Sequence, residues 1–239
     1  MTFAILKSKP VLIGGGVVLV LIAAAAYIQI VQPQNKQAPQ PPPAQSHVNT
    51  ISPDPLPAEA LTQTYAEEGM GYAIMFPDNW VIGKTDQGTK SVVLTGKEGT
   101  NAYGATIVIQ NLLTTKTEGV YADARAAAED LKAQLLTQAQ ETNISQEGDI
   151  AYTTSEKKDV PGVQWYGEFK LNDTPFKQLQ LVLTHPNGAY LHSIAYAAPS
   201  NVYTAIEPTA REIIRSFVMS EEPYNAASST VQAVPAAAR

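Results

Sequence analysis

The residues with the best-defined chemistry in this chain are two histidines, His185 and His192, which flank the segment Pro186-Asn187-Gly188. Asn-Gly is a favoured pair for a type I′ hairpin, and such a turn places the two imidazoles diagonally on one face of a sheet. They could share a metal ion, but a stable site needs three or four ligands, and no carboxylate is locally placed to complete it. We therefore expect core or rim histidines that hydrogen-bond to the backbone.

Other reactive residue types occur here in patterns that do not fit catalysis. Ser193 follows a histidine, but adjacent strand residues point to opposite faces and cannot form a triad. The run Gly14–Gly16 lacks the Lys and Ser/Thr of a phosphate loop. The pairs Glu67-Glu68 and Glu129-Asp130 are sequence neighbours, whose side chains diverge, so we expect solvated surface. Asn143-Ile144-Ser145 matches a glycosylation acceptor, to which we assign no role.

Aromatic residues of the second half remain as candidates for ligand binding: Trp165, Tyr166, Phe169, Tyr190 and Tyr196. They could line a small-molecule pocket, although large aromatic side chains in strands usually fill the core. The chain has no cysteine, which excludes disulfides, thiolate metal sites and a cysteine nucleophile. The sequence thus gives no catalytic, cofactor-binding or metal-ligating residue.

The charge of the chain argues against nucleic acid as a partner. Residues 59–222 contain 12 basic and 21 acidic residues, a net charge of −9, whereas the whole chain carries −6. A surface this acidic repels phosphate backbones and anionic lipid. We expect no nucleic-acid partner and no docking of the folded part on the membrane surface.

The apolar segment 11–31 determines where the chain works. It carries no charge, and at ~1.5 Å per helical residue it spans about 30 Å, the thickness of the hydrocarbon layer of a bilayer. Lys7 and Lys9 precede it, so the positive-inside rule keeps residues 1–10 in the cytoplasm. We predict a single transmembrane helix at residues 11–31 in the inner membrane, with the C-terminal domain in the periplasm.

A cleavable signal peptide is the alternative interpretation of this segment. It would share the basic start, and Ala23–Ala26 offers small residues at the spacing of a cleavage site. The apolar character continues to Val31, beyond the ~7–15 residues of a signal-peptide core, which favours a retained anchor. Both interpretations export the folded domain.

Residues 32–57 are rich in proline and predict an extended, semi-rigid spacer of at most ~80 Å, with His47 as a solvated linker residue. A globular domain is expected at 58–222. Residues 223–239 are small, polar and unpatterned, so we expect a disordered tail.

Within the domain, alternating and β-branched segments predict strands at 72–76, 90–95, 102–112, 149–155, 163–171, 176–185 and 189–197, with a turn at Pro161-Gly162. The Asn187-Gly188 turn would place His185 opposite Tyr190 and Leu183 opposite His192. The predicted core face of this hairpin comprises Leu179, Leu181, Leu183, His185, Tyr190, His192, Ile194 and Tyr196.

Two segments show the period of amphipathic helices. The first is residues 120–140, with an apolar side of Ala124, Ala127, Ala128, Leu131 and Leu135. The second is residues 201–218, with Ser200 as N-cap and Pro208 as a kink or first turn. Its apolar stripe comprises Ile206, Ala210, Ile213, Ile214 and Phe217.

Two stretches resemble a known family. The segment Gly71–Trp80, a strand that ends in Phe-Pro-x-x-Trp, is similar to the start of PsbP-like domains, and Ile213–Phe217 is similar to their end. The superfamily includes the PsbP subunit of photosystem II, DcrB-type bacterial envelope proteins and Mog Ran-binding proteins. The resemblance covers residues 60–220 and implies an α+β fold, an α/β/α sandwich around an antiparallel sheet. It also implies binding or assembly roles in place of catalysis, but no Ran-binding or photosystem residues carry over.

We therefore expect a membrane-anchored, exported and non-catalytic module of the bacterial cell envelope, which binds a protein partner or stabilises a complex and needs no cofactor. Two alternatives remain open. One is a small-ligand-binding module that uses the aromatic residues, and the other is an enzyme whose acid and base come from distant loops.

Overall fold

The computed structural model describes residues 54–85, 91–153 and 159–220. Three predicted segments lie outside these residues. They are the membrane helix 11–31, which includes Gly14–Gly16, most of the proline-rich spacer, which includes His47, and the tail 223–239. Among the residues that are described, no helix combines the length and apolarity needed to cross a bilayer.

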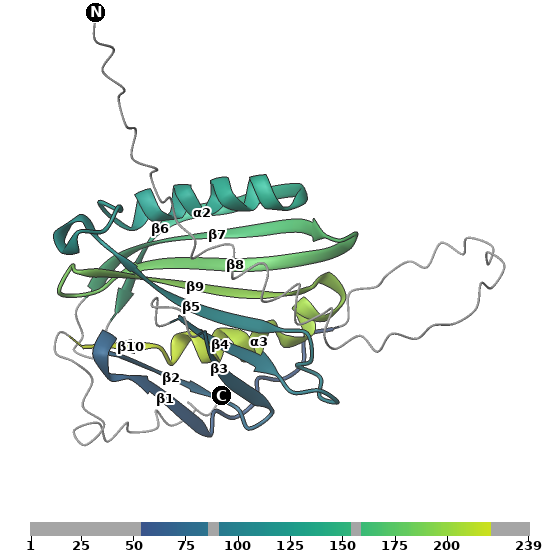
Figure 1. Cartoon of the computed structure of the whole chain (residues 1–239). Helices are drawn as coiled ribbons and strands as arrows, with labels where there is room; N and C mark the ends of the chain where they lie inside the picture. Colours follow the sequence, from purple (N-terminus) through teal and green to yellow (C-terminus); the bar gives the residue numbers. More distant parts are fainter. Residues whose placement is uncertain (1–53, 86–90, 154–158, 221–239) are drawn as a thin grey trace, which may run out of the picture. The chain divides into compact units, whose positions relative to one another are not determined.

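The described residues form two α-helices, two short 3-10 helices and strands, shown in Figure 1. In chain order the elements are β1 (Gln63–Glu67), η1 (Glu68–Met70), β2 (Tyr72–Phe76), β3 (Trp80–Thr85), β4 (Ser91–Gly96), β5 (Thr106–Leu113), η2 (Thr115–Thr117), α2 (Ala124–Gln138), β6 (Gln140–Thr153), β7 (Asp159–Leu171), β8 (Thr174–Thr184), β9 (Tyr190–Pro199), α3 (Ser200–Arg215) and β10 (Val218–Met219).

Two antiparallel sheets carry the described part of the fold. The larger has the strand order β3-β4-β5-β9-β8-β7-β6, and the smaller has the order β1-β2-β10. The central antiparallel sheet was expected from the sequence. The smaller sheet was not, because β1 is largely polar and β10 has only two residues.

The two helices lie on opposite faces of the larger sheet (Figure 1). Helix α2 packs against β6, β7 and β8, whereas α3 packs against β8, β9 and the smaller sheet's β2. Strand β7 contacts both helices, because its successive side chains point to alternate faces of the sheet. Gly167 lies against Leu135 of α2, and its neighbour Tyr166 contacts Arg211 of α3.

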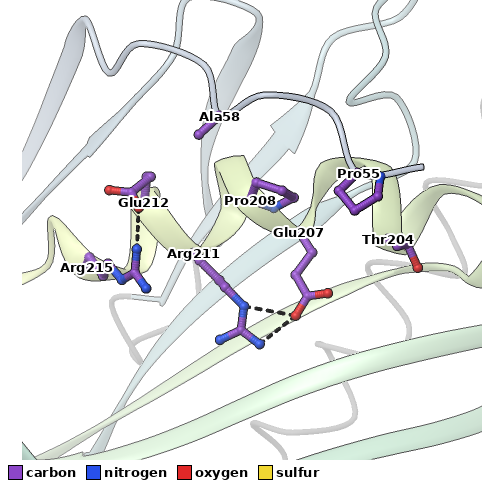
Figure 2. Close-up of a pocket in the computed structure, with 8 residues that line it drawn as sticks. All are labelled: Pro55, Ala58, Thr204, Glu207, Pro208, Arg211, Glu212 and Arg215. Carbon is purple, nitrogen blue, oxygen red and sulfur yellow. Dashed lines mark hydrogen bonds and ion pairs between the residues drawn. The ribbon is translucent and has the colours of Figure 1, made fainter. Parts of the chain in front are cut away.

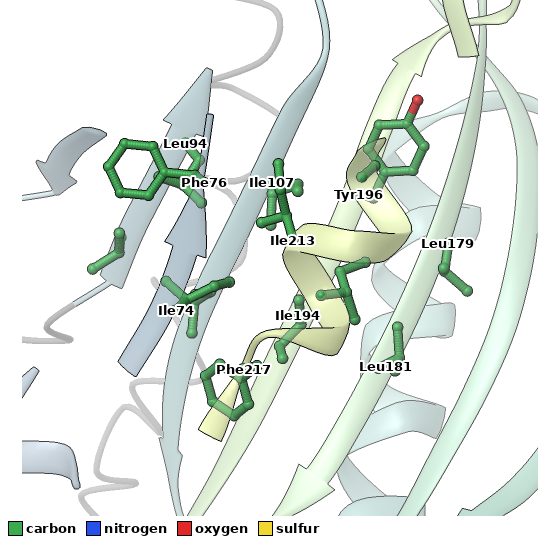
Figure 3. Packing of buried hydrophobic residues seen from close by; sticks show 14 of the residues in the cluster. Ile74, Phe76, Leu94, Ile107, Leu179, Leu181, Ile194, Tyr196, Ile213 and Phe217 are labelled. Atoms are coloured by element: carbon green, nitrogen blue, oxygen red, sulfur yellow. The ribbon is translucent and has the colours of Figure 1, made fainter. Parts of the chain in front are cut away.

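The main core lies between the larger sheet, α3 and the smaller sheet. Figure 3 shows Ile213 of α3 and Ile74 of β2 packed with Ile107 and Ile194 of the larger sheet, and all four are fully buried. The apolar positions predicted on the two helices are all buried. The helical period of the sequence therefore identified the packing faces correctly.

The hairpin of β8 and β9 has the predicted register, but the type I′ turn expected at Asn187-Gly188 is wrong. The N–H of Gly188 donates to the carbonyl of His185 at 2.8 Å, so Pro186 and Asn187 are the central residues, and Asn187 lacks the positive φ that a type I′ turn requires. Leu183 pairs with His192, and the N–H of His185 donates to the carbonyl of Tyr190 at 3.0 Å. Leu179, Ile194 and Tyr196 face the main core as expected.

The turn predicted at Pro161-Gly162 is wrong, because both residues lie inside β7. Pro161 pairs only with Ala151 of β6, while pairing to β8 begins one residue later at Gly162. A proline is tolerated at a position where one neighbour is missing, since its absent N–H need not serve a ladder. A Cβ at position 162 would lie 2.9 Å from the carbonyl oxygen of Val182, so glycine permits this close approach.

Replacing Asp123 by alanine should lower the free energy of unfolding by about 1 kcal/mol. Its carboxylate accepts the N–H of Ala126 at 2.8 Å and caps the start of α2. Ser200, which was predicted as a cap, is instead the first residue of α3, and no side chain caps that helix. Ser200→Ala is therefore the matched control. Chemical denaturation of both variants checks the difference, and equal losses would contradict it.

Candidate functional site

The two predicted histidines meet inside the core. Their ring centroids lie 5.2 Å apart, and His192 is fully buried. The ring of His192 also lies 5.2 Å from that of Tyr72 and 5.4 Å from that of Phe217. His185 bonds to the backbone as expected, because the N–H of Asn187 donates to its Nδ1 at 3.3 Å. The pair thus packs the smaller sheet on the larger one.

His192 is held in its neutral form. Its Nδ1 lies 2.8 Å from Oδ1 of Asn111, an acceptor for which Nδ1 must carry the proton. Burial, and then the nearby charge of His185, lowers the pKa of His192 to about 3. Within the described ranges no three His, Cys, Asp or Glu side chains gather as metal ligands.

Ser193 and the acidic pairs are engaged separately. Ser193 lies on the sheet face opposite to that of His192. There its Oγ accepts a hydrogen bond from Nε2 of Gln180 at 2.9 Å. Glu129 forms an ion pair with Lys132, and the carboxylate of Asp130 accepts a hydrogen bond from the hydroxyl of Tyr121. The carboxylate of Glu67 accepts a hydrogen bond from the hydroxyl of Tyr65, and the side chain of Glu68 lies outside the described part. The structure does not bring these groups together.

The aromatic candidates are distributed over both faces of the larger sheet. Trp165 lies on the α2 side, where it is buried near Gly167. Tyr166 and Tyr196 lie on the α3 side, and the Tyr196 hydroxyl donates to a backbone carbonyl of α3 at 2.9 Å. None of the five aromatic candidates lines the groove described below. Asn143 and Ser145, the possible glycosylation acceptor, lie in the edge strand β6.

A groove opens along the outer side of α3, as Figure 2 shows. Its volume is about 370 Å³. Residues of α3 form its floor, and the extended segment before β1 forms one wall. The lining residues are Pro55, Ala58, Thr204, Glu207, Pro208, Arg211, Glu212 and Arg215.

The wall of the groove is fixed to α3 by backbone groups. The N–H of Leu56 donates to the carbonyl of Ala205 at 3.1 Å. The N–H of Glu59 donates to Oγ1 of Thr209 at 3.1 Å. Prolines flank Leu56 and restrict the backbone on both sides. The end of the proline-rich segment is therefore part of the folded surface.

Paired charges line the floor. Nε and Nη2 of Arg211 donate to Oε1 of Glu207 at 2.9 and 2.5 Å, and Nη2 also donates to the hydroxyl of Tyr166 at 2.6 Å. Arg215 forms an ion pair with Glu212. A guanidinium has five N–H donors, more than one carboxylate uses, so each arginine can bind a further acceptor from a ligand.

Sequence reasoning did not find this groove. The available signal was the helical spacing of Glu207 and Arg211, which more often marks a solvated ion pair. The wall comes from a distant part of the chain, since Glu59 and Thr209 are separated by 150 residues.

No family model and no curated protein sequence matches the chain. Several solved structures are similar to it in part. Cyanobacterial PsbP from Synechocystis has 12% identity and a TM-score of 0.48, with 68% of this chain and 95% of that chain covered. The Ran-binding protein Mog1p of Saccharomyces cerevisiae has 10% identity and a TM-score of 0.46, with coverages of 67% and 96%.

LpqN of Mycobacterium tuberculosis, which is involved in cell envelope biogenesis, has 12% identity and a TM-score of 0.46, with coverages of 62% and 83%. At these identities and TM-scores the likeness supports no conclusion about this chain. The central antiparallel sheet that the sequence resemblance implied is given by the described elements themselves, with α2 and α3 packed on it.

Proposed function

We propose that this chain is a single-pass protein of the inner membrane whose folded domain binds a protein partner on the exported side of a bacterial cell. The charge-free segment 11–31, the basic residues before it and the proline-rich spacer behind it support the placement. The domain then acts as a non-catalytic assembly module held away from the lipid.

The groove along α3 is the observation that supports protein binding. Prolines and an alanine provide apolar contacts, while arginines already paired with glutamates provide directed donors. Such a mixture suits the polar rim and apolar centre of a protein interface. None of the lining residues is a histidine, serine, cysteine or lysine, and both glutamates are held in ion pairs.

A photo-crosslinking residue at Ala58 tests the groove in intact cells. We expect Ala58, an exposed wall residue, to capture a protein partner. The capture should fall about threefold or more with Arg215→Glu, because the reversed charge repels a ligand acceptor. The Arg215 side chain is 69% exposed, so the fold should tolerate this change.

The matched control places the same photo-crosslinking residue at Leu136, an exposed position of α2. Weak capture from Leu136 supports the proposal. Equal capture from both positions, or capture at Ala58 that is insensitive to Arg215→Glu, contradicts a specific groove.

A further inference from the structure

Strand β3 is the terminal strand of the larger sheet in the described part of the chain (Figure 1). It pairs with β4 in an unbroken register, in which Trp80 lies opposite Gly96 at one end and Thr85 lies opposite Ser91 at the other. No described strand pairs with its other side. Val81 is 41% exposed and Ile82 is 38% exposed. Because adjacent strand residues point to opposite faces, apolar surface flanks this edge on both sides of the sheet.

The opposite edge, β6, is built differently. Its pairing with β7 shifts register twice, and Glu141 and Gln146 have positive φ angles of 48° and 50°. Arg125 of α2 forms ion pairs with Glu147 and Asp149 of this strand. Bulges and charges of this kind prevent another strand from adding to an edge.

The β3 edge has fewer of these protections. Its register with β4 is regular, Lys84 is its one charged residue, and no aspartate or glutamate occurs in β3, β4 or β5. The acidic character of the domain is therefore absent from the strands on this side of the sheet. A segment that approaches β3 meets backbone donors and acceptors with apolar side chains beside them.

We propose that β3 accepts an extended segment of a protein partner as an additional strand, bound by backbone hydrogen bonds and by apolar contacts with Val81 and Ile82. This inference rests on the proposed function only in requiring a protein partner, and it uses a surface other than the groove.

The size and charge of the edge argue against a second copy of this chain. Six residues of β3 span about 20 Å, which fits one peptide segment. A stable dimer interface uses roughly 20–30 residues on each side. Pairing two copies would also bring two domains of net charge −9 together. The partner segment should be apolar at alternate positions and neutral or basic.

The test places a photo-crosslinking residue at Val81 and, separately, at Ile82 in the full chain in intact cells, and maps the crosslinked partner residues by mass spectrometry. Strand addition predicts that both positions react with one short partner segment, at sites one to three residues apart. Gly83→Lys should reduce both yields by about tenfold, because a second charge beside Lys84 further opposes pairing on this edge.

Position 83 has room for the change, since the nearest atom to a Cβ there lies 3.9 Å away. Gly148→Lys in β6, where nothing lies within 4 Å, is the matched control and should leave the yields unchanged. Crosslinks to unrelated partner segments, to a second copy of this chain or to nothing would overturn the inference. Those results would leave the groove crosslink at Ala58 as a separate test of the proposed function.

Discussion

Replacing Gly96 by alanine should destabilise the domain by about 3 kcal/mol or more, since overpacking against fixed backbone is among the costly classes of substitution. A Cβ at this position would lie 1.9 Å from the carbonyl oxygen and 2.2 Å from the carbonyl carbon of Ala102. These are backbone atoms, which cannot relieve the overlap by changing rotamer as a side chain can. The N–H of Gly96 also donates to the carbonyl of Ala105 at 3.1 Å, which holds the loop against the strand.

Gly148→Ala is the control for this prediction. No atom lies within 4 Å of a Cβ there, so its free energy of unfolding should change little. Urea denaturation followed by circular dichroism gives both values. A Gly96→Ala domain as stable as the Gly148→Ala domain would show that the 97–105 loop does not pack on β4 as described.

Acid should weaken the domain through His192. Its pKa is about 3 in the folded domain against an ordinary value of 6.5, chiefly because it is buried. The unfolded chain therefore binds a proton more readily than the folded one. The neutral histidine contributes its full stabilisation above about pH 6.5, and this contribution is lost at up to ~1.4 kcal/mol per pH unit as the pH falls towards 3.

His192→Gln isolates this effect, because glutamine retains hydrogen-bonding capacity near Asn111 but does not titrate. Between about pH 7 and pH 5.5 the unmodified domain should lose about 1.3 kcal/mol more than the variant. Denaturant titrations at the two pH values measure the difference. Parallel losses in the two proteins would mean that His192 is accessible to protons in the folded state.

The register of the β8–β9 hairpin could be predicted from the sequence, although its turn type could not. The Pro186-Asn187-Gly188 segment marks where the chain reverses, and a two-residue periodicity on either side specifies the faces. Together they gave the Leu183–His192 pairing that the structure shows. Local signals sufficed here because both strands alternate in polarity and a segment of turn composition joins them.

Among the elements that were missed, β1, β3 and the start of β7 carry no local signal of their own, although their partner strands are neighbours in the chain. β1 is polar, and it becomes a strand because it pairs with β2. Gln63 lies opposite Phe76 at one end of this pairing, and Glu67 lies opposite Tyr72 at the other. Strand β3 begins at Trp80, directly after a proline turn, and is completed by β4. Pro161-Gly162 has the composition of a turn, yet the neighbouring β6 holds it extended.

The groove and the β3 edge could not be predicted for a related reason. The groove exists because Leu56 and Glu59 are held on α3, and the sequence gives no signal for those two backbone contacts. The edge is defined by which strand has no neighbour, a property of the sheet order that no single segment carries.

The most direct test of a tethered, exported binding domain is a topology measurement. Alkaline phosphatase fused after Arg239 should be active, because that enzyme folds only after export, and a green fluorescent protein that folds only in the cytosol should be dark at the same position. Membrane fractionation should recover both fusions with the bilayer. A bright fluorescent fusion with an inactive phosphatase would contradict the account.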